Sequence, residues 1–211
     1  TILEFAYSVD NPAATYRLAD SFTTDRDDQL IETLISRLYD YSRVHPRPLE
    51  WLRQVPAQYE LTAVNSVDDL SFIEPLKKSI QYSLEEATAL IKEMRRIAMM
   101  PDGPAPLIPT AEADLQWIEE AIRRMTMESW EETYAFFQTL KWVRAGAIKK
   151  DSCDELLANR AKAIRDDVKK IVTKVKEDYF LRKPEKLLEE IALMEPSLHT
   201  LVELVHAFGK E

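Results

Sequence analysis

The stretch SCDELLANRAKAIRDDVKKIVTKVKEDYF, residues 152–180, predicts one helix of about eight turns and roughly 40 Å. Its start carries a capping-box pattern, because Glu155 follows Ser152 by three residues. Apolar residues recur at alternating spacings of four and three, which places them in one narrow seam: Leu157, Ala161, Ile164, Val168, Ile171 and Val175. The pattern predicts that one side of this helix packs along a partner helix.

A second stripe of the same helix is basic. At about 100° per residue, four cations fall within roughly 60° of one another: Lys162, Arg165, Lys169 and Lys176. They span about 21 Å of helix axis, which is comparable with several successive phosphates of one DNA strand. Lys149 and Lys150, just before the helix, extend this basic region. The stripe predicts a nucleic-acid contact, and the alternative is a solvated helix face with intermixed charges.

Charge is distributed unevenly along the chain. The 211 residues together carry a net charge of −9, which argues against nucleic acid covering the whole surface. Residues 141–183, however, hold 13 Lys and Arg against 7 Asp and Glu. A local basic segment on an acidic body can still attract a phosphate backbone. Trp142 in this segment could stack on a base, although a Trp is more often an anchor between helices.

Composition excludes several classes of site. With only three glycines there is no glycine-rich phosphate loop, and the one Gly-Lys pair, Gly209-Lys210, is followed by Glu211. We therefore expect no cofactor and no ATPase or nuclease motif in this stretch. The single cysteine, Cys153, excludes an internal disulfide and fits a reducing compartment. No apolar run is long enough to span a membrane, and the first residues do not resemble a signal peptide.

The remaining pattern is helical throughout. Residues 67–99 keep a similar apolar repeat behind the capping-box pair Ser66 and Asp69, so we expect two long antiparallel helices at about 67–99 and 152–180. Shorter helices should complete the bundle, over residues 27–43 and starting at Pro48, Thr110, Ser129, Pro184 and Pro196. The sequence predicts an all-α fold, an irregular helical bundle that forms a single subdomain over residues 1–211. Because the chain begins with Thr1 rather than Met, we expect both ends to be cut from a longer protein.

Metal binding and nucleophilic catalysis find little support in the sequence. His199, Glu203 and His206 share one face of the last helix, but a zinc-protease helix needs two histidines four residues apart. A solvated helix face is the simpler interpretation. Cys153 would need a histidine to activate it, and all three histidines are remote from it in the sequence. Adjacent carboxylates fall on predicted exposed helix surfaces. We therefore assign no catalytic residue and no metal ligand.

Four stretches resemble one protein family, in the same order along the chain. They are DSFTTDRDDQLIETLISRLYDYSRVHPRPLEWL (20–52), PDGPAPLIPTAEADL (101–115), AKAIRDDVKKI (161–171) and LVELVHAFGK (201–210). The most distinctive part is the succession Asp25-Arg26, Tyr39-Asp40-Tyr41-Ser42-Arg43, His45-Pro46 and Trp51-Leu52. On these residues the chain resembles the AddA subunit of bacterial AddAB helicase–nucleases over nearly its whole length.

The resemblance implies a superfamily 1 helicase of the UvrD/RecB type, and within it the helical subdomain called 1B, which is inserted in the first motor domain. In such helicases that subdomain lies against the DNA, near the single-strand path and the incoming duplex. For the parent protein, the resemblance implies ATP and Mg²⁺ as cofactors, an AddB-like partner subunit, cytoplasmic location in bacteria and a role in double-strand break repair and recombination. The family's ATP-binding loop, Asp-Glu box and nuclease carboxylates have no counterpart here, so no site residue is carried over.

Two functions follow as hypotheses. The first is an accessory subdomain that holds DNA, at a junction of duplex and single strand, through non-specific phosphate contacts. Its expected contact residues are Lys162, Arg165, Lys169, Lys176, Lys149 and Lys150. The second is a structural or protein-interaction module that buttresses motor domains or a partner subunit without touching DNA, which the acidic surplus and the two seams suit equally. Neither hypothesis involves a membrane, and no motif argues for a free-standing enzyme.

Overall fold

A computed structural model describes residues 29–149 and 152–209. Every regular element within these residues is a helix, so the predicted all-α fold is confirmed. The chain divides into two compact units. We call residues 72–184 the bundle unit, and residues 1–71 with 185–211 the α9 unit. The expectation of a single subdomain over residues 1–211 stays a prediction. None of the described helices combines the length and the apolar character that crossing a membrane requires.

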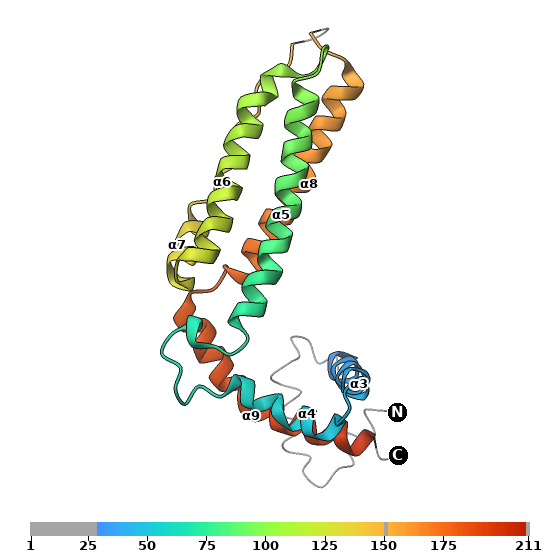
Figure 1. Cartoon of the computed structure of the whole chain (residues 1–211), viewed down its shortest axis with the longest axis vertical. Helices are drawn as coiled ribbons and strands as arrows, with labels where there is room; N and C mark the ends of the chain where they lie inside the picture. Colours follow the sequence, from blue (N-terminus) through green and yellow to red (C-terminus); the bar gives the residue numbers. More distant parts are fainter. Residues whose placement is uncertain (1–28, 150–151, 210–211) are drawn as a thin grey trace. The chain divides into compact units, whose positions relative to one another are not determined.

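The bundle unit consists of four helices, α5 (Ile73–Ala98), α6 (Ile108–Met127), α7 (Trp130–Gln138) and α8 (Glu155–Tyr179), with a short 3₁₀ helix, η3 (Ala105–Leu107), before α6. The central helix is α5, because α6 and α8 both pack along it. The colours of Figure 1 show that α5 and α8 run side by side in opposite directions. The expected pair of long helices is therefore present, with shorter bounds than the sequence predicted.

The core of the bundle unit forms where α5 meets its neighbours. Residues of α5 at helical spacing are fully buried there, namely Ile80, Leu84, Ala87, Ile91 and Met94. At the α7 end the core becomes aromatic, since the Phe180 ring stacks on Phe137 at 4.1 Å and on Trp130 at 4.8 Å between centroids. Trp130 and Phe137 are buried. Stacked aromatic rings add to the free energy that burial alone supplies.

The first long helix begins later than its sequence pattern predicted. Ser66 and Asp69 do form a capping box, but it stands at the start of a separate 3₁₀ helix, η2 (Val67–Asp69). The backbone of Leu70 is extended, so the chain leaves the helical conformation there. The α-helix starts only at Ile73, which places Pro75 in its first turn, where the missing N–H has no partner to lose. The predicted start near residue 67 is thus wrong by about two turns.

The start of α8 also differs from the prediction. Its N-cap is Asp154, whose Oδ1 accepts a hydrogen bond from the Leu157 N–H at 2.9 Å. The predicted capping box of Ser152 with Glu155 does not form, because the Ser152 hydroxyl donates to the Lys149 carbonyl at 2.7 Å. A carboxylate at the N-cap also interacts favourably with the positive end of the helix dipole, which favours Asp154 over a serine two residues earlier.

The buried face of α8 is rotated from the predicted seam. Its buried residues alternate by three and four, as expected, but they are Ala158, Ala161, Arg165, Val168, Val172 and Val175. Leu157, Ile164 and Ile171, which the prediction placed in the seam, are only half-buried. At about 100° per residue, the centre of the buried face lies roughly 50° from the predicted one. This rotation carries Arg165 out of the exposed stripe and into the bundle.

An extended segment without regular structure, residues 140–149, leads from α7 back toward the start of α8. We call it the strap. The Gly146 N–H donates to the Thr110 hydroxyl of α6 at 3.3 Å, and beyond the strap the Asp154 N–H donates to the Asp102 carbonyl at 2.7 Å. A Cβ on Gly146 would lie only 1.9 Å from the Pro106 carbonyl oxygen, so the strap fits against η3 only because this residue is glycine.

The described part of the α9 unit is built on α3 (Gln29–Arg43), α4 (Pro48–Gln54) and most of α9 (Pro184–Phe208), with the short 3₁₀ helix η1 (Pro56–Tyr59) after α4. These helices share one core, made of Ile31, Ile35, Leu52, Leu198, Leu201, Val202, Leu204 and Val205. The helix predicted over 27–43 is confirmed within its described part, and residues 27 and 28 lie outside it. Pro48 opens α4 as predicted, at a position where its fixed φ suits a helix start.

The sequence predicted two helices where α9 is one. Pro196 was expected to start a second helix, but it lies inside the continuous helix Pro184–Phe208. A proline in a helix interior removes one backbone hydrogen bond. The residues that follow it are buried in the core of the unit, and packing of an apolar face contributes more to helix stability in proteins than any single backbone bond. The predicted break at Pro196 is therefore wrong.

Candidate nucleic-acid interface

Arg165 lies inside the bundle rather than on its surface. Its side chain is 6% exposed, and that of its partner Asp114 on α6 is 2% exposed. Arg165 Nε donates to Asp114 Oδ2 at 2.7 Å and Nη2 donates to Oδ1 at 3.3 Å. The same Nη2 also donates to the Val143 carbonyl of the strap at 2.7 Å. Because this side chain is buried and its charge is neutralised by Asp114, the prediction that Arg165 faces outward toward a phosphate backbone is wrong.

The sequence held a signal for this ion pair that the predicted seam did not take into account. Asp114 follows Ala111 by three residues and precedes Ile118 by four, on the buried side of α6. Arg165 holds the equivalent place in the buried seam of α8. A charged side chain at a seam position in each of two helices indicates a buried pair, since neither charge could be buried alone. The contact with the strap carbonyl could not be anticipated, because it depends on the path of an irregular segment.

The other predicted cations of α8 lie at the surface. Lys162 is exposed and Lys176 is half-buried, and neither forms an ion pair with a described acidic side chain. Lys169 is 34% exposed, and its Nζ lies 3.8 Å from Asp166 Oδ1, too far for a hydrogen bond. Lys150, which was also predicted, lies outside the described residues. Three lysines of the predicted stripe therefore remain available on one flank of α8.

The strap brings further cations to this flank, of which Lys149 was among the predicted contacts and Lys141 and Arg144 were not. Its contact with Arg165 fixes the strap beside α8, since that residue lies on the same side of the helix as the three lysines. Its own cations are exposed, namely Lys141, Arg144 and Lys149. We call the combined set the basic face: Lys162, Lys169 and Lys176 of α8 with Lys141, Arg144 and Lys149 of the strap. Trp142, the residue considered for base stacking, is half-buried.

Several other cations of the bundle unit are paired with carboxylates, although Lys78, Lys174 and Lys183 are not among them. Arg95 of α5 pairs with Glu112 of α6 at 3.1 Å, and further pairs join Lys92 to Glu119, Arg96 and Arg160 to Glu93, and Arg123 and Arg124 to Glu120. Within the described residues, by contrast, the basic face makes no ion pair closer than 3.8 Å. A phosphate group approaching the basic face would therefore not have to displace a carboxylate.

The tightest ionic cluster lies at the end of α6. The hydrogen bond from Arg123, at 2.7 Å, is the main reason that the pKa of Glu120 is lowered to about 2, and Arg124 contributes as well. In the same way, the hydrogen bond from Arg96 lowers the pKa of Glu93. These carboxylates are held ionised by neighbouring guanidinium groups at the surface. A general acid requires a pKa raised toward neutrality, whereas the pKa values of these two carboxylates are lowered.

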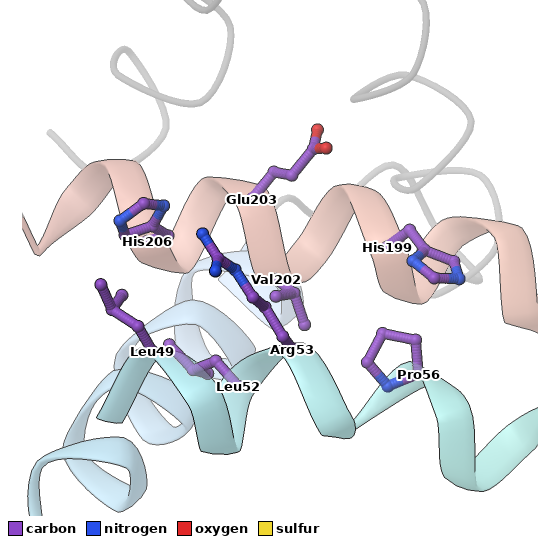
Figure 2. Close-up of a pocket in the computed structure, with 8 residues that line it drawn as sticks. All are labelled: Leu49, Leu52, Arg53, Pro56, His199, Val202, Glu203 and His206. Atoms are coloured by element: carbon purple, nitrogen blue, oxygen red, sulfur yellow. The ribbon is translucent and has the colours of Figure 1, made fainter. Parts of the chain in front are cut away.

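A second candidate site is a pocket of about 280 Å³ in the α9 unit. Figure 2 shows Arg53 extending from α4 toward α9, with His199 and His206 at opposite ends and Glu203 directed away from α4. His199 Nε2 instead lies 2.9 Å from Glu195 Oε1, one turn earlier in α9. Over residues 29–149 and 152–209, no group of three or more His, Cys, Asp or Glu side chains is placed to hold a metal ion. The pocket therefore assembles no metal or catalytic set from the described residues.

The curated proteins to which this chain is similar, as given below, share one name. The AddA subunit of the ATP-dependent helicase/nuclease from Lysinibacillus sphaericus strain C3-41 is 48% identical over 214 residues, which cover 100% of this chain and 17% of that protein. The proteins of the same name from Bacillus velezensis and Listeria innocua are each 35% identical, over 209 and 210 residues, which cover 99% of the chain. The chain spans 17% of the length of these three relatives. No protein-family model matches the chain.

Proposed function

Because this chain belongs to the AddA family of ATP-dependent helicase/nuclease subunits and is homologous over its whole length to one segment of them, we propose that it is an accessory part of such a protein and contacts DNA through the basic face. These relatives confirm the family resemblance seen in the sequence. Their name describes a protein that is both a helicase and a nuclease. The segment would supply contacts with the nucleic acid while the chemistry takes place elsewhere in the protein.

The observation that carries this proposal is the contrast in charge pairing within the bundle unit. Five cations of α5 and α6 are paired with carboxylates at 2.7–3.2 Å, whereas those of the basic face make no ion pair closer than 3.8 Å with a described residue. Surface cations that merely keep a helix in solution gain nothing from standing together without counter-charges. A row of unpaired cations on two neighbouring elements fits a ligand with a repeated negative charge, such as a phosphate backbone.

The proposed mechanism is positioning. Lysine ammonium groups neutralise phosphates as point charges and read no base sequence, so the contacts would hold DNA in place regardless of its sequence. The bound phosphates release their condensed counterions, which makes the affinity fall as salt is added. Such contacts can guide a duplex or a single strand past the segment without stopping it, as a helicase requires.

Fluorescence anisotropy with a labelled DNA that joins a duplex to a single strand tests the proposal. We expect the 211-residue chain to bind weakly at about 50 mM salt, with an affinity that falls linearly on a log–log plot against salt. The triple variant Lys162→Glu, Lys169→Glu and Lys176→Glu should lose binding, since each change replaces an attraction to phosphate with a repulsion.

The matched control changes the same net charge on other surfaces of the same unit. It combines Lys170→Glu and Lys174→Glu, which lie about 100° and about 140° around α8 from the middle of the lysine row, with Lys92→Glu on α5. We expect the control to retain most of the affinity. Equal loss in both triple variants would mean that only total charge matters, and the basic face would not be the site. If the unaltered chain shows no salt-dependent binding, the structural or protein-interaction role becomes the better explanation.

For the parent protein, we extend the proposal to the properties of the AddA family. We infer that it uses ATP and Mg²⁺, works with an AddB-like partner subunit, and takes part in double-strand break repair and recombination in the bacterial cytoplasm. This segment holds no Walker loop, because Gly209-Lys210 is followed by Glu211. A DNA-stimulated ATPase assay on the 211-residue chain should therefore give the background rate, and a rate above background would contradict the assignment.

A further inference from the structure

Arg165 joins three elements of the bundle unit through one side chain. It belongs to α8, pairs in bidentate fashion with Asp114 of α6, and donates to the Val143 carbonyl of the strap. The pair is almost fully enclosed, with side-chain exposures of 6% and 2%. A planar guanidinium carries five donors in a fixed fork, so it can bond a carboxylate and a carbonyl at the same time. The strap is therefore tied to both helices at a single point.

This tie determines which strap residues lie beside which residues of α8. An extended chain advances about 3.3 Å per residue and a helix about 1.5 Å, so one strap residue spans roughly two helical residues. The two segments run in opposite directions past the contact between Val143 and Arg165. Counting from that contact, Lys141 lies at about the level of Lys169, and Arg144 lies at about the level of Lys162.

We propose that Arg165 is a positioning residue, which holds the strap cations Lys141 and Arg144 in register with Lys169 and Lys162 so that the two rows bind one phosphate chain together. The inference rests on the proposed function of the basic face. In this arrangement Arg165 touches no phosphate itself. It acts through the strap, and its loss would separate the two rows while leaving every cation of the basic face in the chain.

The chemistry of the pair argues for this role over simple stabilisation of the bundle. Well-packed apolar residues of similar volume hold two helices together at least as well as a buried ion pair does. Apolar residues, however, cannot donate a hydrogen bond to the strap carbonyl. Packing of the two helices alone would not require the ion pair. The hydrogen bond to the strap carbonyl does require a donor such as the Arg165 guanidinium.

The test uses the double variant Arg165→Met and Asp114→Leu in the 211-residue chain. It removes one positive and one negative charge and replaces both with apolar side chains of similar size. The matched control is Arg95→Met and Glu112→Leu, which removes an ion pair between α5 and α6 at the surface, away from the strap. Three quantities are measured in each: the denaturant midpoint, hydrogen exchange of the amides of residues 140–149, and DNA affinity at several salt concentrations.

We expect the double variant to fold with a midpoint close to that of the parent chain, while its strap amides exchange faster. Its DNA affinity at about 50 mM salt should fall at least fivefold, and the slope of log affinity against log salt should decrease by about two, because two phosphate contacts are lost. The control should change neither the slope nor the strap exchange. If the double variant does not fold, Arg165→Lys gives the same test, since an ammonium group can pair with Asp114 but lacks the fork that also reaches Val143.

The possible results separate the two proposals. Suppose that the unaltered 211-residue chain binds DNA and that the folded double variant binds with the same affinity and the same salt slope. This result would overturn the role of Arg165 and leave the proposed function standing. Unchanged exchange of the strap amides in that variant would overturn it as well. A parent chain that does not bind DNA would overturn both.

Discussion

At the scale of single residues, we expect the stability of the chain to be especially sensitive to substitution at two buried positions. Arg165 and Asp114 form an ion pair that is almost fully excluded from water. A charge buried without a partner is far more costly than a pair removed together. The two residues therefore form a unit, and single and double substitutions of them should differ sharply.

Arg165→Leu alone should destabilise the chain by about 3–5 kcal/mol, because it leaves the Asp114 carboxylate buried and unpaired. The double variant Arg165→Met and Asp114→Leu should instead lie within about 1 kcal/mol of the parent or above it, since no uncompensated charge remains. Denaturant unfolding followed by circular dichroism measures both. Equal destabilisation in the two variants would show that apolar side chains cannot fill the space left by the pair.

Gly146 is the other sensitive position. A Cβ there would lie 1.9 Å from the Pro106 carbonyl oxygen, which is backbone and cannot move aside as a side chain would. Gly146→Ala should therefore destabilise the chain by about 1–3 kcal/mol, the usual cost of forcing atoms into a packed space. Ala145→Ser, at the exposed neighbouring position, provides the control and should be nearly neutral. A neutral Gly146→Ala in thermal unfolding would contradict the close approach of strap and η3.

At the scale of elements, the start of α8 distinguishes the structure from the sequence pattern. Asp154 caps the helix through the Leu157 N–H, whereas Ser152 bonds the carbonyl of Lys149 outside the helix. Asp154→Ala should cost about 1 kcal/mol, as the loss of an N-cap usually does. Ser152→Ala should cost less than half as much. If chemical denaturation shows that Ser152→Ala destabilises the chain more than Asp154→Ala does, the result would support the capping box that the sequence pattern predicted.

Sequence reasoning found most helices but misjudged which side of α8 is buried and where one helix ends. Helix spacing identified α5, α6 and α8 because their apolar repeats are long and regular. It failed at Arg165, since Ile164 offered a more apolar seam and hid the ion pair that rotates α8. It failed at Pro196 because tertiary packing outweighed a local helix breaker. Of the strap cations, the sequence analysis named Lys149 but not Lys141 or Arg144, because an irregular segment has no period that fixes its path.

At the scale of the whole molecule, charge is distributed unevenly along the chain. The chain carries a net charge of −9, yet residues 141–183 hold 13 Lys and Arg against 7 Asp and Glu. Two carboxylates that bind arginines, Glu120 and Glu93, have lowered pKa values. Such groups make stability depend on pH in a defined direction.

Glu120 should make the chain sensitive to acid. Its pKa is lowered from 4.5 to about 2 in the folded chain, so its contribution to stability is fully present above pH 4.5 and is lost as the pH falls toward 2. Glu120→Gln should lower the melting temperature at neutral pH and flatten its decline between those two pH values. Thermal melts of the parent and the variant across this range provide the measurement. Parallel curves would mean that Glu120 titrates alike in the folded and unfolded chains.

The two strap anchors also limit how the chain can change in length. Val143 is fixed by Arg165 and Gly146 by Thr110, and only two residues lie between them. An extended chain covers at most about 10 Å over that interval, so we expect that deleting one residue would strain an anchor and that an insertion would bulge outward. Among chains that share this bundle, gaps in an alignment should avoid residues 143–146, even though the segment looks like an ordinary surface loop.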